Sequence, residues 1–278
     1  MIHAPLITLN DGTQIPQLGL GVWQLDNAQA YTSSKAALQA GYRHIDTAMI
    51  YGNEVGVGRA VAESDIARNE IFITTKLWNA EHGYDQTLRA FDESLKRLQL
   101  ETLDLYLIHW PLPSKGAYVD SWRAMVRLRD EGRVRSIGVS NFHQEHLQRI
   151  IDATSVIPSV NQIEIHPDFV QAPLVAFSRQ HGIATESWSP LGQGGALLQE
   201  PLLARIAARL GKSSAQVVLR WHLQSGHIVI PRSTNTERIA ANIHVFDFVL
   251  DAEDMLQISH IPQTGRLGPD PDTFEMGA

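Results

Sequence analysis

Three short apolar segments of the sequence each lead to side chains that can hold or transfer a proton. The first ends on Asp46 and is followed by Tyr51, the second ends on Lys76, and the third ends on His109. If the three segments are neighbouring parallel strands, their carboxyl ends meet at one edge of a sheet, where α/β proteins bind ligands. The sequence therefore predicts that these four side chains surround one ligand.

The types of the four side chains suit proton transfer to a carbonyl oxygen. A tyrosine phenol has a pKa of about 10 in water, and a nearby ammonium lowers it by favouring the phenolate. Lys76 would tune Tyr51 in this way, and Asp46 would keep Lys76 charged. His109 would hold the substrate oxygen by a hydrogen bond. Because no side chain donates hydride, carbonyl reduction at this site would need a cofactor.

Each residue, taken alone, also has a purely structural explanation. Asp46, Ser140 or Asn141 could each cap a helix. Lys76 could extend its ammonium to solvent, and His109 could be a hydrogen-bonded turn residue. The functional interpretation is favoured because polar or aromatic residues recur at the same place in successive units of the chain.

The surrounding sequence alternates between helical and strand patterns. Amphipathic segments end at Gly41, Gly132, Gly182 and Gly226, and an apolar strand pattern follows each glycine. Glycine suits the left-handed backbone conformation that ends many helices. Strand ends are expected before Gly21 and near residues 46, 76, 109, 140, 163, 188 and 231.

This alternation predicts a parallel α/β fold of about eight strand–helix units. Periodicity does not separate a closed barrel from a doubly wound sheet. No Gly-x-Gly-x-x-Gly opens the first helix, however, and eight units favour a (β/α)₈ TIM barrel. Residues 6–9 and 13–15 flank an Asn10-Asp11-Gly12 turn and are predicted to form an N-terminal β-hairpin. We expect one domain over 1–278, with 265–278 as a loose C-terminal tail.

Composition narrows the class of partner. The 278 residues are 44% hydrophobic and carry a net charge of -7, which argues against nucleic acid or an anionic membrane as the main partner. The absence of cysteine excludes a thiolate nucleophile and a cysteine metal site, and no metal site is predicted. Neither a signal peptide nor a spanning apolar segment is recognised, so a cytoplasmic location is expected. A small-molecule partner and a monomeric state are also expected.

The sequence resembles the aldo-keto reductase family over nearly its whole length, and within it the bacterial 2,5-diketo-D-gluconate reductases. The matching motifs are GYRHIDTA at 41–48, LYLIHWP at 105–111, IGVSNF at 137–142, NQIE at 161–164 and RLGPDPD at 266–272. The resemblance implies a (β/α)₈ barrel whose bottom is plugged by the hairpin. It also implies NADPH-dependent reduction of small aldehydes, α-dicarbonyls and keto-sugar acids, of the 2,5-diketo-D-gluconate or methylglyoxal type.

By the same resemblance, Tyr51 is the general acid, Lys76 and Asp46 set its pKa, and His109 orients the carbonyl. The residues expected to bind the cofactor are Ser140, Asn141, Gln162, Trp188, Ser189, Leu191, Gln193, Gly194, Arg232, Ser233, Arg238 and Asn242. The residues expected to wall the substrate pocket are Trp23, Trp78, Asn79 and Trp110. The family's usual Pro-Lys-Ser is Pro-Arg-Ser at 231–233, and arginine still binds phosphate.

Two other functions are compatible with a barrel of this kind. A Schiff-base aldolase could use Lys76, but the lysine would have to be neutral, which a nearby Asp46 opposes. A non-catalytic module that senses a cofactor would not need all four of Asp46, Tyr51, Lys76 and His109.

Overall fold

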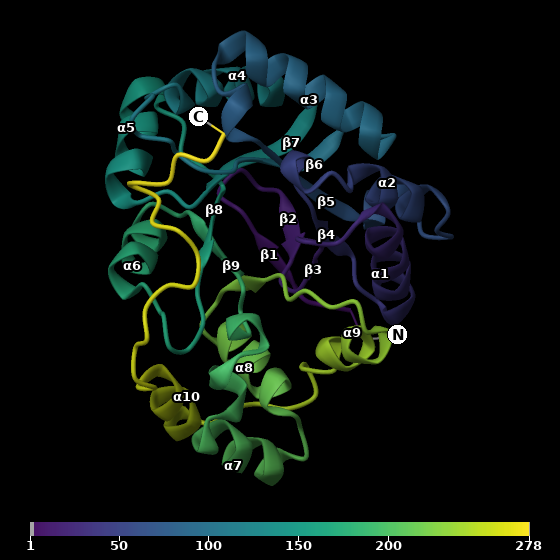
Figure 1. Cartoon of the computed structure of the whole chain (residues 1–278), viewed down its shortest axis with the longest axis vertical. Coiled ribbons are helices and arrows are strands. Elements are labelled where there is room, and N and C mark those ends of the chain that lie inside the picture. The colour runs from purple at the N-terminus through teal and green to yellow at the C-terminus, as the bar shows by residue number, and fades with distance from the viewer. Residues whose placement is uncertain (1–2, 278) are drawn as a thin grey trace.

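The computed structural model describes residues 3–277 and contains a parallel barrel wrapped by helices (Figure 1). Eight strands pair in chain order: β3 (Leu20–Gly21), β4 (His44–Asp46), β5 (Phe72–Leu77), β6 (Leu103–Ile108), β7 (Val134–Ser140), β8 (Val160–Glu164), β9 (Ala184–Trp188) and β10 (Ile228–Val229). Parallel bridges from Leu18 to Val229 and from Gly21 to Arg232 join the last strand to the first. The sheet therefore closes, which confirms the predicted barrel and excludes the doubly wound sheet.

Helices surround the barrel on its outer face (Figure 1). They are α1 (Asn27–Ala40), α2 (Glu54–Ala62), α3 (Tyr84–Leu98), α4 (Tyr118–Asp130), α5 (Gln144–Thr154), α6 (Ala172–Gln180), α7 (Pro201–Leu210), α8 (Ser214–Gln224), α9 (Thr236–Ile243) and α10 (Ala252–Ser259). Local sequence sets their ends. Helix α1 begins where the Asp26 carboxylate accepts the backbone N–H of Gln29, and it ends at Gly41, whose φ is 108°.

A hairpin of β1 (Leu6–Thr8) and β2 (Gln14–Pro16) closes the amino end of the barrel, as the sequence predicts. Leu9 and Ile15 pack against apolar side chains of β5, β6, β8 and β10. The Asp11 carboxylate in its turn accepts hydrogen bonds from Ser136 Oγ at 2.6 Å and Ser159 Oγ at 2.8 Å. Since Ser136 lies early in β7 and Ser159 just precedes β8, the hairpin leaves the carboxyl ends of the strands free.

The C-terminal segment is attached to the barrel and does not fit the loose tail that the sequence predicts. After α10 the chain runs past α6 and α5, in yellow in Figure 1. The Glu164 carboxylate accepts the N–H of Gly268 at 3.0 Å, and the Phe274 ring centroid lies 4.3 Å from that of Trp110. The polar, Pro- and Gly-containing sequence of this segment gives no indication of these contacts.

Within residues 3–277, no helix is both long and apolar enough to cross a lipid bilayer.

Candidate active site

The four predicted catalytic residues meet at the carboxyl end of the barrel. Lys76 Nζ donates to Asp46 Oδ1 at 2.6 Å and to the carbonyl of Thr47 at 2.8 Å. The same ammonium lies 5.2 Å from the centre of the Tyr51 ring, and the His109 ring lies edge-on to that ring at 5.6 Å. The structure therefore brings together the four residues that the sequence singles out, and not one of them is left on a distant surface.

Strand register explains how these residues meet. Parallel pairing sets Asp46 beside Thr74 and Lys76 beside Leu107, so successive strands deliver their last side chains to the same edge. Tyr51 is placed by a short 3₁₀ turn that follows β4. Asn53, fully buried next to this turn, accepts from Thr47 Oγ1 at 2.7 Å and donates to two backbone carbonyls of the preceding loop. The buried amide of Asn53 thus fixes the backbone that follows the turn carrying Tyr51.

Burial and charge set the protonation states of the site. Burial alone lowers the pKa of Lys76, but the charge of Asp46 and its hydrogen bond outweigh burial and leave that pKa above its usual value. Lys76 therefore keeps its proton, which weakens the Schiff-base alternative. Burial, helped by the Lys76 charge, holds the pKa of His109 well below its usual range, so the imidazole is neutral.

The predicted lowering of the Tyr51 pKa is wrong for this structure. Burial raises the pKa of Tyr51 to about 12, and the Lys76 charge offsets only part of that rise. The ammonium is visible in the sequence, whereas the loss of water around the phenol is a property of the folded structure. At neutral pH the tyrosine therefore holds its proton and can act as an acid.

Glu186 is a buried carboxyl group of the site that sequence reasoning missed. It lies on β9 with no exposed surface, and its Oε2 accepts from Gln162 Nε2 at 2.8 Å. The same Gln162 nitrogen donates to Asp46 Oδ2 at 2.8 Å. Burial, with the nearby Asp46 charge, raises the pKa of Glu186 to about 8. Parallel pairing places Glu186 directly beside Gln162, and that register was the signal that could have identified it.

Three of the residues expected to bind the cofactor form a hydrogen-bonded group beside the four predicted catalytic residues. Trp188 Nε1 donates to Asn141 Oδ1 at 2.8 Å, which fixes a half-buried indole at the end of β9. Asn141 Nδ2 donates to Ser140 Oγ at 3.1 Å and to the carbonyl of His109 at 3.0 Å. Neither Ser140 nor Asn141 caps α5, whose N-cap is His143.

The other expected cofactor residues lie in two segments that follow β9 and β10. Ser189, Gln193 and Gly194 have φ of 48°, 54° and 75°, in a partly exposed loop that also contains Leu191. The second segment holds Arg232, Ser233, Arg238 and Asn242, of which only Asn242 is buried. The Arg232 guanidinium donates to the carbonyl of Trp23 at 3.2 Å and to the side chain of Gln24 at 3.3 Å.

Three of the four expected pocket residues gather near His109. The Trp78 ring lies edge-on to His109 at 5.3 Å, and Trp110 packs against Phe274. Asn79 Nδ2 donates to the carbonyl of Met276 at 2.8 Å, so the C-terminal segment completes this wall. The fourth, Trp23, has 41% of its surface exposed, and its backbone carbonyl accepts from Arg232 at 3.2 Å.

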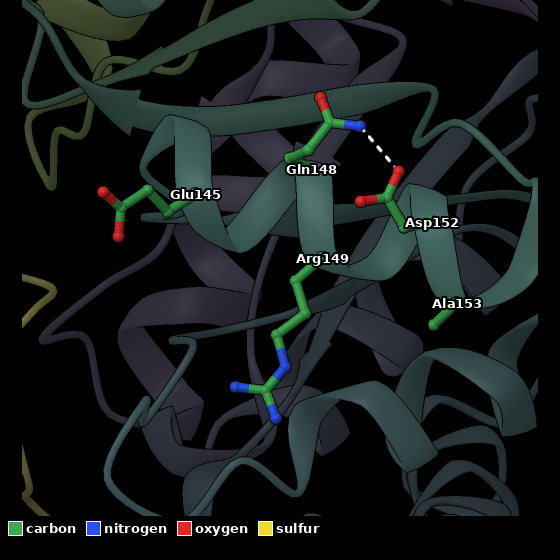
Figure 2. A pocket seen from close by; sticks show the side chains of 5 residues that line it. All are labelled: Glu145, Gln148, Arg149, Asp152 and Ala153. Atoms are coloured by element: carbon green, nitrogen blue, oxygen red, sulfur yellow. Dashed lines mark hydrogen bonds between the residues drawn. The ribbon is translucent and has the colours of Figure 1, made fainter.

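Two other surface features lie outside this site. Figure 2 shows a shallow hollow on α5 lined by Glu145, Gln148, Arg149, Asp152 and Ala153, and it contains none of the predicted site residues. Its charges are mixed, and Gln148 donates to Asp152 at 2.7 Å. The hollow shows no arrangement that would carry out chemistry.

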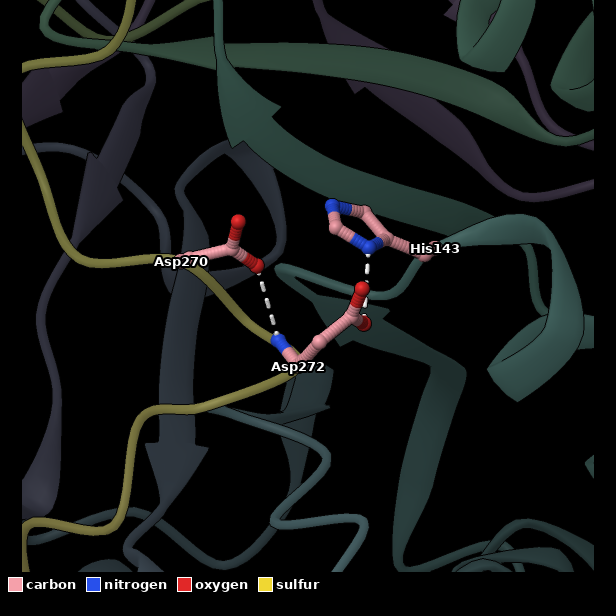
Figure 3. Close-up of side chains that lie close together, drawn as sticks. All are labelled: His143, Asp270 and Asp272. Atoms are coloured by element: carbon pink, nitrogen blue, oxygen red, sulfur yellow. Dashed lines mark hydrogen bonds and ion pairs between the residues drawn. The ribbon is translucent and has the colours of Figure 1, made fainter.

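Figure 3 shows His143, Asp270 and Asp272, whose ligand atoms lie within 4.8 Å of one another. His143 Nδ1 contacts Asp272 Oδ1 at 2.8 Å, and Asp270 accepts the backbone N–H of Asp272 at 3.0 Å. The Arg266 guanidinium lies 3.4 Å from the other nitrogen of His143. These contacts tie the C-terminal segment to α5, and the nearby arginine disfavours a cation.

Known proteins resemble this chain in both sequence and structure. A family model described as the Aldo/keto reductase family matches residues 17–262. The chain is 55% identical over 271 residues to an aldo-keto reductase of a Mycobacterium species, with 98% of each chain covered. It is 50% identical over 275 residues to methylglyoxal reductase DkgA of Escherichia coli, with 99% of each covered. A crystal structure of a Gox0644 mutant in complex with NADPH is 51% identical in sequence and superposes with a TM-score of 0.94. The match covers 98% of this chain and 99% of that one.

Proposed function

This chain belongs to the aldo/keto reductase family, and from that premise we propose that it reduces small carbonyl compounds to alcohols with NADPH. The observation that carries the proposal is the buried Lys76–Asp46 pair, at 2.6 Å, beside Tyr51 and His109. A charged lysine next to a protonated phenol and a neutral imidazole supports proton donation to an oxygen that is gaining negative charge.

The residues at the barrel mouth fit NADPH. The half-buried Trp188 offers a flat face for a nicotinamide ring, and Asn141 fixes its orientation. The exposed Arg232 and Arg238 flank Ser233 close to the N-terminus of α9, where cations and backbone N–H groups suit a phosphate. When bound, NADPH supplies the hydride that adds to the carbonyl carbon.

The protein's own side chains supply the proton and the orientation. His109 and Tyr51 hold the carbonyl oxygen from two sides, so that oxygen points to the phenol as its negative charge grows. Tyr51 then passes its proton to the oxygen, which completes the alcohol. The ammonium of Lys76 stabilises the phenolate that remains until solvent returns the proton, and Asp46 holds the ammonium in place.

The substrates we propose are α-dicarbonyls and keto-sugar acids, of the methylglyoxal or 2,5-diketo-D-gluconate type, together with small aldehydes. The pocket wall formed by Trp78, Trp110 and Phe274 offers flat apolar area, while His109 and Asn79 offer hydrogen bonds. The E. coli relative at 50% identity is named a methylglyoxal reductase.

The proposal is tested by following NADPH oxidation with a panel of aldehydes, α-dicarbonyls, keto-sugar acids and steroid ketones. We expect the highest kcat/KM for a small dicarbonyl or keto-sugar acid. A kcat/KM for a steroid ketone above that of every small dicarbonyl would overturn the substrate assignment. No NADPH oxidation with any carbonyl compound would overturn the proposed activity itself.

A further inference from the structure

The Gln162 side chain makes an unusual pair of contacts beneath the site. Its Nε2 donates to Asp46 Oδ2 and to Glu186 Oε2, both at 2.8 Å, so each of its two N–H groups meets a carboxyl oxygen. Among residues 3–277, the hydrogen bonds of this side chain are made by its nitrogen, and no N–H or O–H donates to its Oε1. Gln162 and Glu186 are neighbours in the parallel register of β8 and β9, which makes their contact a direct consequence of the sheet.

These contacts fix which end of the amide faces inward. An amide oxygen only accepts and an amide nitrogen only donates, so the two ends are chemically distinct. If the amide were reversed, its oxygen would face Asp46, whose charge is maintained by Lys76. That arrangement would replace a hydrogen bond with repulsion and leave the buried Asp46 oxygen without a donor.

Glu186 accepts the second N–H of the Gln162 amide. Asp46 alone would hold one N–H and leave the other without an acceptor in a buried site. Glu186 offers Oε2 as an acceptor whether or not the carboxyl group carries a proton. Burial and the Asp46 charge raise the pKa of Glu186 to about 8, so the neutral acid places no second negative charge beside Asp46 at neutral pH.

We infer that Glu186 is a positioning residue that, together with Asp46, points the Gln162 nitrogen inward and leaves its Oε1 to accept an N–H from the carboxamide of the bound cofactor. This inference rests on the proposed use of NADPH. It assigns a role to a residue that touches neither cofactor nor substrate, and it links the cofactor site to the Asp46–Lys76 pair through a single amide.

The test compares the affinity of the protein for NADP with its affinity for the 3-acetylpyridine analogue of NADP, by quenching of protein fluorescence. The analogue carries a methyl ketone where NADP has the carboxamide, so it has no N–H to donate to Gln162. One neutral hydrogen bond predicts that the wild type prefers NADP by roughly 3–10-fold. Glu186→Leu should reduce that preference to within about twofold, and Glu186→Gln, which keeps an acceptor oxygen, should retain most of it.

A matched control is Ser187→Ala, which removes a fully buried polar side chain from the adjacent position of β9. It should leave the preference at the wild-type value. A preference in Glu186→Leu equal to the wild type would overturn the inference, as would equal weakening of both ligands in that variant. If the wild type binds neither ligand, the proposed cofactor fails instead, so the two failures are distinguishable.

A second measurement needs no variant. Because both N–H groups of Gln162 bond to buried carboxyl oxygens, both Nε2 protons should exchange with solvent much more slowly than those of an exposed glutamine, as seen by NMR of the wild type. Exchange of either proton at the rate of an exposed side-chain amide would overturn the orientation, even if Glu186→Leu does not fold.

Discussion

Replacing Glu186 with glutamine should flatten the dependence of protein stability on pH. The side chain is fully buried, and burial together with the Asp46 charge raises its pKa to about 8, while Gln162 and Lys76 offset only part of the rise. In the unfolded chain the same group titrates near its ordinary pKa of about 4.5. Between these two values the folded protein holds a proton that the unfolded chain has lost.

The sign of the effect follows from this difference in bound protons. The stabilisation from a raised carboxyl pKa is fully present below the unfolded pKa and is lost as pH rises through the folded pKa. In that window, from about pH 4.5 to about pH 8, Glu186 makes the free energy of unfolding fall by up to about 1.4 kcal/mol per pH unit. Glutamine does not titrate and has nearly the same volume, so the variant should lack this slope.

The assay is urea unfolding of both proteins at several values between about pH 5 and pH 8, followed by tryptophan fluorescence. The difference in unfolding free energy, wild type minus Glu186→Gln, should decrease steadily as pH rises. Ser187→Ala, a buried polar change at the next position of β9, should keep the wild-type slope. Parallel curves for wild type and Glu186→Gln would refute the reasoning. Such parallel curves would show that Glu186 is ionised in the folded protein over this pH range.

Three further perturbations test other parts of the account. Lys76→Met leaves the buried Asp46 without its cation and should lower the free energy of unfolding, measured by urea unfolding, by about 3–5 kcal/mol. Adding Asp46→Asn should recover part of the lost stability, and no recovery would argue against the ion pair. Arg232→Gly should weaken NADPH by roughly 10–100-fold and leave NADH nearly unchanged, measured by fluorescence quenching, because one charge-assisted contact to the 2′-phosphate is lost; equal losses for both cofactors would exclude that role. Phe274→Ala removes the ring that packs on Trp110 and should raise KM for small carbonyl compounds severalfold at unchanged NADPH affinity; an unchanged KM would place the C-terminal segment outside the pocket.

The barrel, and the edge of its sheet that carries the candidate site, could be predicted from the sequence because the same strand and helix patterns repeat along the chain. Each apolar strand pattern ends on a polar or aromatic residue, and helix-ending glycines such as Gly41 and Gly132 mark the start of the next unit. In a parallel sheet this regularity is enough to bring Asp46, Lys76 and His109 together before any distance is known. Closure of the sheet depends on bridges such as Leu18 to Val229, which no local pattern reveals.

What the sequence could not reveal depends on burial and on contacts between distant segments. Glu186 lies within a strand in which polar and apolar residues are mixed, so it resembles a solvent-facing residue until the register sets it beside Gln162. The rise in the Tyr51 pKa cannot be read from the sequence, because it comes from the loss of water around the phenol, which outweighs the charge of Lys76. The C-terminal segment is attached through backbone N–H groups to Glu164, and backbone contacts leave no trace in residue types.

The central claim, that Tyr51 donates the proton, is tested most directly by Tyr51→Phe. The change removes the phenol oxygen and keeps the ring that contacts His109. We expect kcat for a small dicarbonyl to fall by roughly 10²–10⁴-fold while the affinity for NADPH, from fluorescence quenching, stays within about twofold. Tyr31→Phe, on the exposed face of α1, should behave as the wild type. A Tyr51→Phe protein that keeps near-wild-type kcat would contradict the claim, because the proton would then have another source.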